Sequence, residues 1–569
     1  MMQYIIIAIS LMFFVSCSKN KSLYIQSPQE QNDATYSADL SLEGIYDHLL
    51  IKFPQYKDIS YTEPSENYIE PSKWLLQTPN AWYINEKEYA KGFKPKKDHI
   101  MHSLFYVPTC NIQKDCQGIS VCKSVPYTFD GKKLCLTKAH DILEEIYRTI
   151  ISAKRTVDIT TLADPFNGEF IQGAFDGVIK NAIITLGYAS IKYDHPVAIR
   201  LLAGSAINFR DNKEYLKEIS KKLPAGNKLI ISIAYMRSCF GQDNCSSDKT
   251  QDAAELGFSW NHAKIINADS KVLITGGQNL WGKDYLSSNP VNDTNIKIIG
   301  QVANGATAYA NALWDYVKSR ADRDLDVNHC YTYLNGKISM QCPENFSFNK
   351  YIFKPEKNYI KIKAIPIGKL GGGVKIEGDD QSEVARVFAL KSAKHTIKIS
   401  QQAIFSRKTL TRDLLYPIVT KEGNVIQAIA YAIYKNNVDV YIVTSHINAN
   451  YTYTPNIELK YISRAIRNAM ARDYNLSKHE AVKKLKKHLK LGYIGTANDA
   501  DPEVESHNKF WMVDDRIFYL GSHNFYPAAL QEFGVIVEGA AAQILLEDFW
   551  NPMWSNSIKK HNALWRDKE

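Results

Sequence analysis

The sequence predicts an α/β protein built from two similar halves that pack as a pseudo-twofold pair around one shared site. An uncommon pattern, His-x-Lys-(x)4-Asp followed by a Gly-rich turn that ends in Asn, occurs twice, and the two histidines lie 245 positions apart. Around each copy, strands rich in β-branched residues alternate with amphipathic helical stretches. Such alternation is typical of a sheet covered by helices on both faces. We therefore expect each half to contribute one half-site where the halves meet.

The first element is an apolar run near the chain start, IIIAISLMFFV, which ends in Val15-Ser16-Cys17. It is too short to span a bilayer comfortably. Residues 1–17 resemble a bacterial lipoprotein signal, in which Cys17 becomes the lipidated first residue. The n-region MMQY lacks Lys and Arg, and Phe14 stands where Leu is preferred, so a plain secretion signal is the alternative. We expect an exported bacterial lipoprotein at the outer membrane or cell surface, or a secreted protein.

The cysteines agree with export. Eight remain after Cys17, and an even, clustered set in an exported chain predicts disulfides, most simply between neighbours in sequence. The connectivity within the first four cannot be read from the sequence. Metal binding is the rival interpretation, but no His stands at zinc-finger spacing, so no metal or other cofactor is expected. The clusters are Cys110, Cys116, Cys122 and Cys135; Cys239 and Cys245; and Cys330 and Cys342.

The N-terminal half is expected over residues 18–335. A helical stretch, AHDILEEIYRTIISA, precedes the strand TVDITTLA, and further apolar strands follow before the first motif. Within the motif, HAKIINAD and KVLITGGQN are predicted to form two strands joined by a turn at Asp269-Ser270. Because side chains two apart in a strand face the same way, His262 and Lys264 are expected on one face.

The C-terminal half, residues 336–569, repeats this order. A segment of mixed character from about 335 to 390 is predicted to link the halves. The glycines 371–373 within it lack the Lys-Ser/Thr that follows in a phosphate-binding loop, so an ordinary loop is expected there. Ser392-Ala393-Lys394-His395-Thr396 then matches Ser152-Ala153-Lys154-Arg155-Thr156 at an offset of 240. The strand pair HNKFWMVDD and RIFYLGSHN carries the second motif. Before it, AVKKLKKHLKLGY (residues 481–493) has apolar residues on one side and lysines elsewhere, which favours a core-packed helix over a membrane-surface helix.

The motif residues suit attack on a phosphodiester. An imidazole can be the nucleophile, a lysine can neutralise phosphoryl oxygens, and an asparagine amide can donate to them. The candidate residues are His262, Lys264 and Asn279 in the first copy and His507, Lys509 and Asn524 in the second.

A carboxylate follows each motif just before a strand and could orient that motif's histidine by holding one ring nitrogen. These carboxylates are Asp293 and Glu532, and solvated acids at a strand start are the alternative. Asp269 and Asp514 stand in the turns, where a structural role is at least as well supported as a chemical one. The remaining candidates are substrate contacts: Gly276, Gly277 and Gly521, which allow close approach of the backbone to a phosphate, and Ser522.

Together these motifs resemble the phospholipase D superfamily, and in particular its secreted bacterial branch. The resemblance runs through WLLQTP at 74–79, VDITTLADPFNG at 157–168, GFSWNHAKI at 257–265, GGQNLWGKDYL at 276–286 and GSHNFYPAALQEFGVIVE at 521–538. It implies a metal-independent two-step reaction through a phosphohistidine, with His262 as nucleophile and His507 as general acid and then base. Lys264, Lys509, Asn279 and Asn524 would hold the phosphate. Gly277 departs from the pattern, since a Ser is common there, so only Ser522 offers a hydroxyl.

Three functions compete at this stage. The first is a phospholipase D that cleaves the head-group alcohol from a glycerophospholipid at a membrane surface, acting as a monomer with two internal half-sites. The second is a nuclease of the superfamily; such members are usually short with one motif, so no specific nucleic acid is expected here. The third is a non-catalytic surface lipoprotein. Trp281, Tyr285 and Tyr526 could contact a choline head group by cation–π interaction or belong to the core. The net charge of +9 over 569 residues fits anionic substrates or surfaces but is too small for a dedicated nucleic-acid binder.

Overall fold

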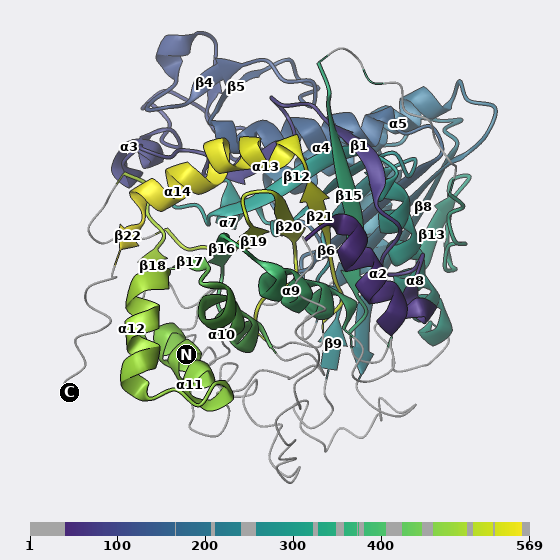
Figure 1. Cartoon of the computed structure of the whole chain (residues 1–569). Coiled ribbons are helices and arrows are strands. Elements are labelled where there is room, and N and C mark those ends of the chain that lie inside the picture. Colours follow the sequence, from purple (N-terminus) through teal and green to yellow (C-terminus); the bar gives the residue numbers. More distant parts are fainter. Residues whose placement is uncertain are drawn as a thin grey trace, which may run out of the picture.

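Figure 1 shows the computed structural model of the chain. It describes residues 40–164, 167–205, 211–239, 258–321, 328–348, 355, 358–371, 374, 380–404, 424–445, 459–497, 504–526 and 530–559. The predicted signal segment with Cys17 lies outside these residues, as does Cys245. Within the described part, no helix is long and apolar enough to cross a membrane.

One large sheet contains the same six-strand arrangement twice. In the first copy the strand order is β8–β7–β6–β10–β11–β12, with β6, β7 and β8 parallel and the next pairs antiparallel. In the second copy the order is β18–β17–β16–β19–β20–β21, with the same directions. The first copy comprises β6 (Thr156–Leu162), β7 (Val197–Gly204), β8 (Leu229–Cys239), β10 (Ile265–Ala268), β11 (Val272–Gly276) and β12 (Asp293–Gly300); the second comprises β16 (Thr396–Gln401), β17 (Asp439–Thr444), β18 (Leu489–Tyr493), β19 (Lys509–Val513), β20 (Ile517–Gly521) and β21 (Glu532–Glu538). The predicted α/β fold with two similar halves is confirmed.

The two copies are joined in the middle of the sheet. Strand β1 (Ser65–Ile69) pairs with β12 on one side and with β15 (Ile360–Lys369) on the other, and β15 pairs with β21. Strand β2 (Leu75–Thr78) also pairs with β12. The expected linking segment at 335–390 contains β15, whose alternating isoleucines give a strand between the two copies that was not predicted. Gly371 lies in a loop, and Gly372 and Gly373 lie outside the described residues.

The remaining strands lie at the sheet margins or in a separate lobe. A hairpin of β13 (Tyr331–Leu334) and β14 (Lys337–Met340) extends the sheet beyond β8. The predicted domain boundary at 335/336 falls in the turn of this hairpin, and the place where the halves divide stays a prediction. The shorter strands are β9 (Phe258–Trp260) and β22 (Ile558–Lys559), while β3 (Thr109–Cys110), β4 (Val121–Lys123) and β5 (Lys133–Leu136) form a small separate sheet.

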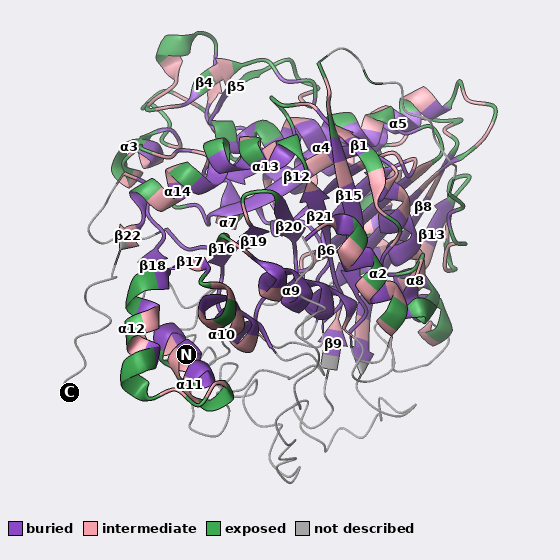
Figure 2. Ribbon diagram, viewed as in Figure 1, coloured by how far each residue is buried: buried purple, intermediate pink, exposed green. Residues whose placement is uncertain are grey.

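Helices cover both faces of the large sheet. Figure 1 shows α4, α5, α13 and α14 along one side and α2, α8, α9 and α10 along the other. Figure 2 shows that the strands between them are buried, while exposed residues lie on the outer faces of the helices. In α4, Ile142, Ile146 and Ile150 recur at four-residue steps and are buried, as the apolar periodicity predicts. The helices are α2 (Leu42–Lys52), α3 (Glu86–Lys91), α4 (Asp141–Ser152), α5 (Ala174–Ser190), α6 (Asn212–Ser220), α7 (Gly282–Tyr285), α8 (Val302–Arg320), α9 (Gln381–Ser392), α10 (Val425–Asn436), α11 (Leu459–Asp473), α12 (Lys478–His488), α13 (Ala540–Leu545) and α14 (Asn551–Asn556).

The lysine-rich stretch at 481–493 is half helix and half strand. Helix α12 ends at His488, and Leu489 begins β18, which pairs with β17. Ala481 and Leu485 of the helix are buried, so the core-packed interpretation was correct for the helical part. The prediction that Leu489 continues the helix was wrong, because its backbone joins the sheet instead.

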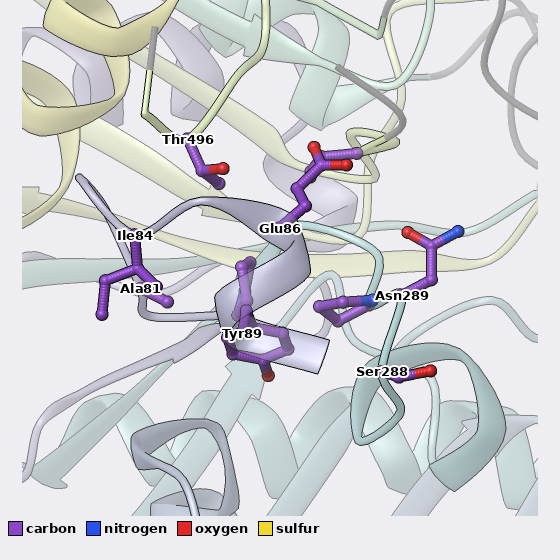
Figure 3. Close-up of a pocket in the computed structure, with 10 residues that line it drawn as sticks. Ala81, Ile84, Glu86, Tyr89, Ser288, Asn289 and Thr496 are labelled. Carbon is purple, nitrogen blue, oxygen red and sulfur yellow. The ribbon is translucent and has the colours of Figure 1, made fainter. Parts of the chain in front are cut away.

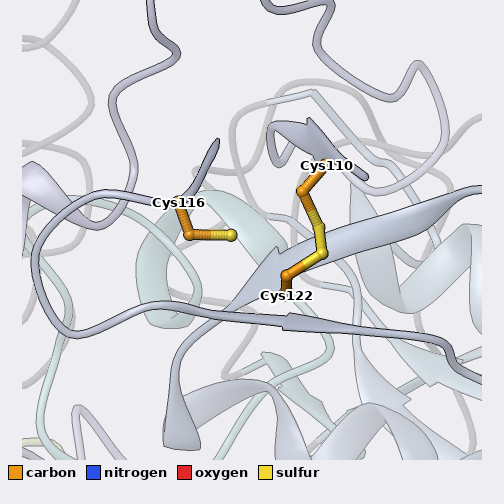
Figure 4. Close-up of side chains that lie close together, drawn as sticks. All are labelled: Cys110, Cys116 and Cys122. Atoms are coloured by element: carbon orange, nitrogen blue, oxygen red, sulfur yellow. A yellow bond between two sulfur atoms is a disulfide. The ribbon is translucent and has the colours of Figure 1, made fainter. Parts of the chain in front are cut away.

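Three disulfides are present in the described residues. Cys330–Cys342 joins neighbours in sequence, as the simplest expectation had it. The first four cysteines are interlaced instead: Cys110 pairs with Cys122, and Cys116 pairs with Cys135. Figure 4 shows Cys110 bonded to Cys122 with Cys116 close by. These three sulfurs form the one cluster of potential metal ligands found in the described part of the chain. Because every one of them is in a disulfide, the cluster does not fit a thiolate metal site.

Candidate active site

The two motif turns hold each half together in the same way. After β10, Asp269 and Ser270 both have positive φ, and after β19, Asp514 and Asp515 do the same. The Asp269 carboxylate accepts hydrogen bonds from the backbone N–H groups of Lys154, Arg155 and Thr156 at 2.7–2.8 Å. The repeated Ser-Ala-Lys segment therefore serves to present backbone donors to this carboxylate.

In the second half, Asp514 accepts the matching three bonds from Lys394, His395 and Thr396 at 2.7–2.9 Å. The structural interpretation of both turn aspartates fits this geometry. They fix the strand that precedes each motif to the turn within it.

Both histidines are buried and each is held by a carboxylate from the opposite half. Glu532 Oε2 lies 2.8 Å from Nδ1 of His262, and Asp293 Oδ2 lies 2.6 Å from Nδ1 of His507. The sequence had suggested that each carboxylate orients the histidine of its own motif. That pairing was wrong, because β12 contacts β20 and β21 contacts β11 of the opposite half, and each brings its first residue to the other half's histidine.

The crossing is reinforced by the backbone. His262 donates its N–H to the carbonyl of Gln531, and His507 donates its N–H to the carbonyl of Asn292, both at 2.8 Å. Gln531 and Asn292 are the residues immediately before Glu532 and Asp293. Each orienting carboxylate is thus carried on a segment already bonded to the histidine that it orients. These cross-links left no signal in the local sequence pattern.

The two lysines have equivalent positions. Lys264 Nζ donates to the carbonyl of His262, and Lys509 Nζ donates to the carbonyl of His507, both at 2.6 Å. Both lysines are buried. Burial lowers the pKa of Lys264 to about 7, against the opposing effect of the two site carboxylates, and it lowers the pKa of Lys509 well below its usual value.

The asparagines of the motifs are also buried. Among the described residues, neither the oxygen nor the nitrogen of the Asn279 side chain has a hydrogen-bond partner, and the Asn524 side-chain oxygen has none. Buried amides are ordinarily satisfied, so these groups are placed for a ligand that is not part of the chain. The Asn524 amide donates to Tyr526 at 2.9 Å, which brings the Tyr526 hydroxyl next to the site.

The carboxylates differ in their surroundings. Ser522 donates to Glu532 Oε2 at 2.5 Å. Burial raises the pKa of Glu532, but His262, Lys264 and the Ser522 hydrogen bond outweigh it and leave that pKa below its usual value. Burial dominates at Asp293 and raises its pKa to about 7. The two half-sites are therefore chemically unequal.

Steric crowding explains why glycine stands at position 277, the counterpart of Ser522. A Cβ at Gly277 would lie 2.2 Å from Asp293 Oδ1, so no side chain fits there. A hydroxyl reaches this half-site from another residue instead: the Tyr285 oxygen lies 3.3 Å from Asp293 Oδ2 and 3.1 Å from His507 Nδ1. From the sequence, Tyr285 is expected to be only a head-group contact or a core residue.

The other two motif glycines also pack tightly. A Cβ on Gly276 would meet Asn295, and one on Gly521 would meet the Tyr519 hydroxyl and Gly534. Close packing of neighbouring strands thus explains why both positions are glycine. The expected close approach of their backbone to a phosphate stays a prediction.

Trp281 lies in the core, 5% exposed, and its indole N–H donates to the carbonyl of Leu162 at 2.9 Å. This contact favours the core interpretation for that aromatic residue. Its neighbour Lys283 pairs with the buried Asp164 at 2.7 Å. Trp281 and Lys283, which follow Asn279, therefore bind the end of β6 and the loop after it.

Burial also governs the histidines. It lowers the pKa of His262 to about 4, although Glu532 opposes the shift, and it lowers the pKa of His507 well below its usual value, helped by Lys509, Lys264 and His262. Neutral imidazoles held at Nδ1 direct their chemistry to Nε2. Two such rings, two lysines and two asparagines form a site suited to nucleophilic attack on an anionic phosphorus centre.

A small pocket of about 10 Å³ lies beside the segments that lead into Asn292 and His507. Figure 3 shows Glu86, Tyr89, Ser288, Asn289 and Thr496 around it. None of the motif residues lines it, so it adds nothing to the chemistry of the site.

Comparison with known proteins finds similarity over most of the chain. No family model matches the chain. Phospholipase D of Streptomyces antibioticus is 27% identical over 538 residues, which cover 86% of this chain and 81% of that protein. A phosphatidylserine synthase structure from Haemophilus influenzae Rd KW20 is 16% identical, covers 75% of this chain and 87% of its own, and has a TM-score of 0.43. Nuc, a phospholipase D family member from Salmonella typhimurium, is 20% identical, covers 34% of this chain and 97% of its own, and has a TM-score of 0.20.

The duplicated fold and the crossed histidine–carboxylate pairs form the site of a phosphodiesterase, and most of the chain resembles the phospholipase D superfamily. Its relative from Streptomyces antibioticus bears the name phospholipase D.

Proposed function

We propose that this protein is a phospholipase D that cleaves the head-group phosphodiester of glycerophospholipids to give phosphatidate and an alcohol. The observation that carries the proposal is the pair of buried histidines, each held at Nδ1 by a carboxylate of the other half. The similarity to a protein named phospholipase D over 86% of the chain supports a lipid substrate.

In the first step, Nε2 of His262 attacks phosphorus, and the bond from phosphorus to the head-group oxygen breaks. Protonated His507 donates its proton to the leaving alcohol. Lys264, Lys509, Asn279 and Asn524 hold the phosphoryl oxygens. An anionic phosphate in the site would raise the pKa of His507, because it offsets the two lysines that lower it.

In the second step, a water molecule gives its proton to His507 and attacks phosphorus. The bond from phosphorus to His262 breaks, which releases phosphatidate and restores both rings. A primary alcohol that reaches the intermediate would react in the same way and give a phosphatidyl alcohol. We therefore expect transphosphatidylation as well as hydrolysis.

The unequal carboxylates favour His262 as the nucleophile. A phosphorylated imidazole is cationic, and the adjacent Glu532, whose pKa is lowered, is ionised and stabilises that cation. Asp293, whose pKa is raised to about 7, suits the histidine that gains and loses protons.

The test is incubation with head-group-labelled phosphatidylcholine, phosphatidylethanolamine and phosphatidylglycerol in excess ethanol, with DNA in parallel. We expect head-group release, phosphatidylethanol as a product, and no cleavage of DNA. His262→Ala and His507→Ala should each abolish turnover while the far-UV circular dichroism is unchanged. Cleavage of lipid without any ethanol adduct would exclude the covalent route, and cleavage of DNA alone would exclude the lipid substrate.

Chelators are expected to leave this activity largely intact, because the lysines neutralise the phosphoryl charge. Complete loss with EDTA, restored by one particular metal ion, would contradict the scheme.

We further propose that the chain is exported and anchored through Cys17. Disulfides in the folded part are typical of exported proteins. Cys17→Ser should release the protein from membranes, since the anchor would consist of acyl chains. Retention in the membrane fraction after the signal has been removed would rule out lipidation.

A further inference from the structure

The small sheet of β3, β4 and β5 belongs to a disulfide-stapled lobe that exposes an unusual number of apolar side chains. Fifteen large hydrophobic residues are exposed in the described part of the chain, and seven of them fall within residues 100–129. Monomeric proteins seldom gather apolar residues at one place on the surface without a binding function. Figure 2 shows the exposed loops of this lobe around β4 and β5.

Five of the seven form what we call the apolar tip. Four lie on one loop, and the fifth lies on a second loop that approaches the first where His102 Nε2 lies 3.2 Å from Asp130 Oδ2. The apolar tip consists of Ile100 (74% exposed), Met101 (39%), Leu104 (42%), Tyr106 (65%) and Phe129 (58%).

The apolar tip is held rigidly from inside. Phe105, between two exposed members, is buried, and its ring contacts the buried Tyr127 edge-on at 5.1 Å between centroids. The backbone of the first loop is closed by hydrogen bonds from His102 to Val107 and from Thr109 to Ile100. The two interlaced disulfides lie in the stretch of chain that comes immediately after this loop. A preformed apolar surface loses little conformational entropy on binding.

Basic residues are frequent in the stretch of chain that carries the apolar tip. Residues 94–138 contain eight lysines and three aspartates, so this stretch carries a net charge of +5 out of +9 for the whole chain. Lys96 and Lys97, a few positions before Ile100, are exposed. Exposed apolar side chains in a lysine-rich stretch match an anionic lipid surface, which takes the apolar groups into its interface and attracts the cations.

The apolar tip also lies close to the proposed site. A Cβ on Gly173 would be 3.8 Å from the Tyr106 ring and 3.4 Å from Cα of Gly282. Gly282 starts α7, three positions after Asn279, and donates its N–H to the carbonyl of Gln172. A membrane that receives the apolar tip would thus lie next to the segment that carries the phosphate-binding asparagine.

We propose that the apolar tip and its lysines dock this enzyme on anionic lipid bilayers, so that the active site draws its substrate from the membrane surface. This inference rests on the proposed lipid substrate. It is independent of Cys17, because it is a property of the folded lobe.

The test compares two matched triple variants of the mature chain without the lipid anchor. The first removes the apolar tip: Ile100→Ser, Tyr106→Asn and Phe129→Ser. The second changes the same residue types at distant exposed positions: Ile51→Ser, Tyr188→Asn and Phe348→Ser, which are 81%, 60% and 49% exposed. Asn at position 106 tolerates the positive φ of Tyr106.

Binding is measured by sedimentation with vesicles of phosphatidylcholine containing about 30% phosphatidylglycerol, with all chains carrying His262→Ala so that no lipid is consumed. We expect the tip variant to lose vesicle binding at least about tenfold, since three side chains no longer enter the interface, while the control variant binds like the parent. Lys96→Glu with Lys97→Glu should weaken binding to these vesicles but not to vesicles of phosphatidylcholine alone.

Turnover is measured with His262 restored. The tip variant should cleave a short-chain phosphatidylcholine below its micelle concentration as fast as the control does, which shows that the site is intact, and should be slow only on vesicles. Equal vesicle binding by the two triple variants would overturn the proposal, as would self-association in solution that the tip substitutions abolish. A parent chain that binds vesicles through the apolar tip yet cleaves no lipid would instead contradict the proposed function and leave the docking surface standing.

Discussion

His262 and Glu532 stand 270 positions apart in the chain and 2.8 Å apart in the folded protein. The equivalent pair, His507 with Asp293, crosses the molecule in the opposite direction. Each half therefore supplies the histidine of one half-site and the carboxylate of the other.

The crossed pairs make separable predictions for the two steps. With a p-nitrophenyl phosphodiester, whose leaving group needs no acid, Glu532→Gln should slow the burst of nitrophenol about 10²- to 10⁴-fold because it disturbs the nucleophile. Asp293→Asn should preserve the burst and slow the steady state, because it disturbs the base. Stopped-flow absorbance distinguishes the two. The reverse assignment of effects would mean that His507 is the nucleophile.

The Tyr285 hydroxyl is expected to position His507 in place of the hydroxyl that Gly277 cannot provide. Tyr285→Phe should lower kcat roughly 5- to 10-fold, the value of about one hydrogen bond, with the loss confined to the steps that use His507. Tyr61→Phe is the control, since that buried hydroxyl donates to the carbonyls of Leu49 and Phe53 away from the site. Equal losses in both variants would show that Tyr285 acts only through stability.

The turn aspartates should matter for stability rather than for chemistry. Asp269→Ala and Asp514→Ala each remove an acceptor of three backbone N–H groups, and each should cost about 1.5–3 kcal/mol of unfolding free energy. Urea denaturation measures this loss. Asp194→Ala, at a side chain that is 94% exposed, should be neutral. A large fall in kcat at unchanged stability would give these residues a direct role.

The pH dependence of kcat/KM follows from the protonation states of the buried lysines and histidines of the site. His262 must be neutral to attack, so activity should fall as the pH drops through its pKa of about 4. Lys264, Lys509 and the general acid His507 must be protonated, and burial lowers the pKa of all three, that of Lys264 to about 7, so activity should also fall by the time the pH rises through 7. We expect a maximum at mildly acidic pH. Lys264→Arg, which keeps its charge, should move the alkaline limb upward. A limb near the usual lysine pKa of 10.5 in the parent would contradict this account.

The repeated fold and the motif residues could be predicted because they leave local marks in the sequence. β-Branched runs on either side of Asp269, and aromatic and aliphatic runs on either side of Asp514, specify the two strand pairs, and both turns formed as predicted. The Ser-Ala-Lys repeat marked the strands that these turns hold.

What the sequence could not reveal depends on the arrangement of the two halves. Spacing alone assigned Asp293 to His262, since nothing local records that β12 faces the other half. The role of β15 was missed for the same reason: its partners β1 and β21 are almost 300 and more than 160 residues away in the chain. The interlaced pairing of Cys110 with Cys122 likewise depends on how the lobe folds.

The crossed pairing has a consequence for the integrity of the enzyme. Neither half contains a histidine together with the carboxylate that orients it. Strand β1, near the start of the described chain, joins the two copies at a seam, because it pairs with both β12 and β15. A fragment from either side of that seam would fold, at most, into a catalytically incomplete unit. Proteolysis or truncation that removes one half should therefore silence both half-sites at once, so that a damaged copy cannot persist as a partly active phosphodiesterase.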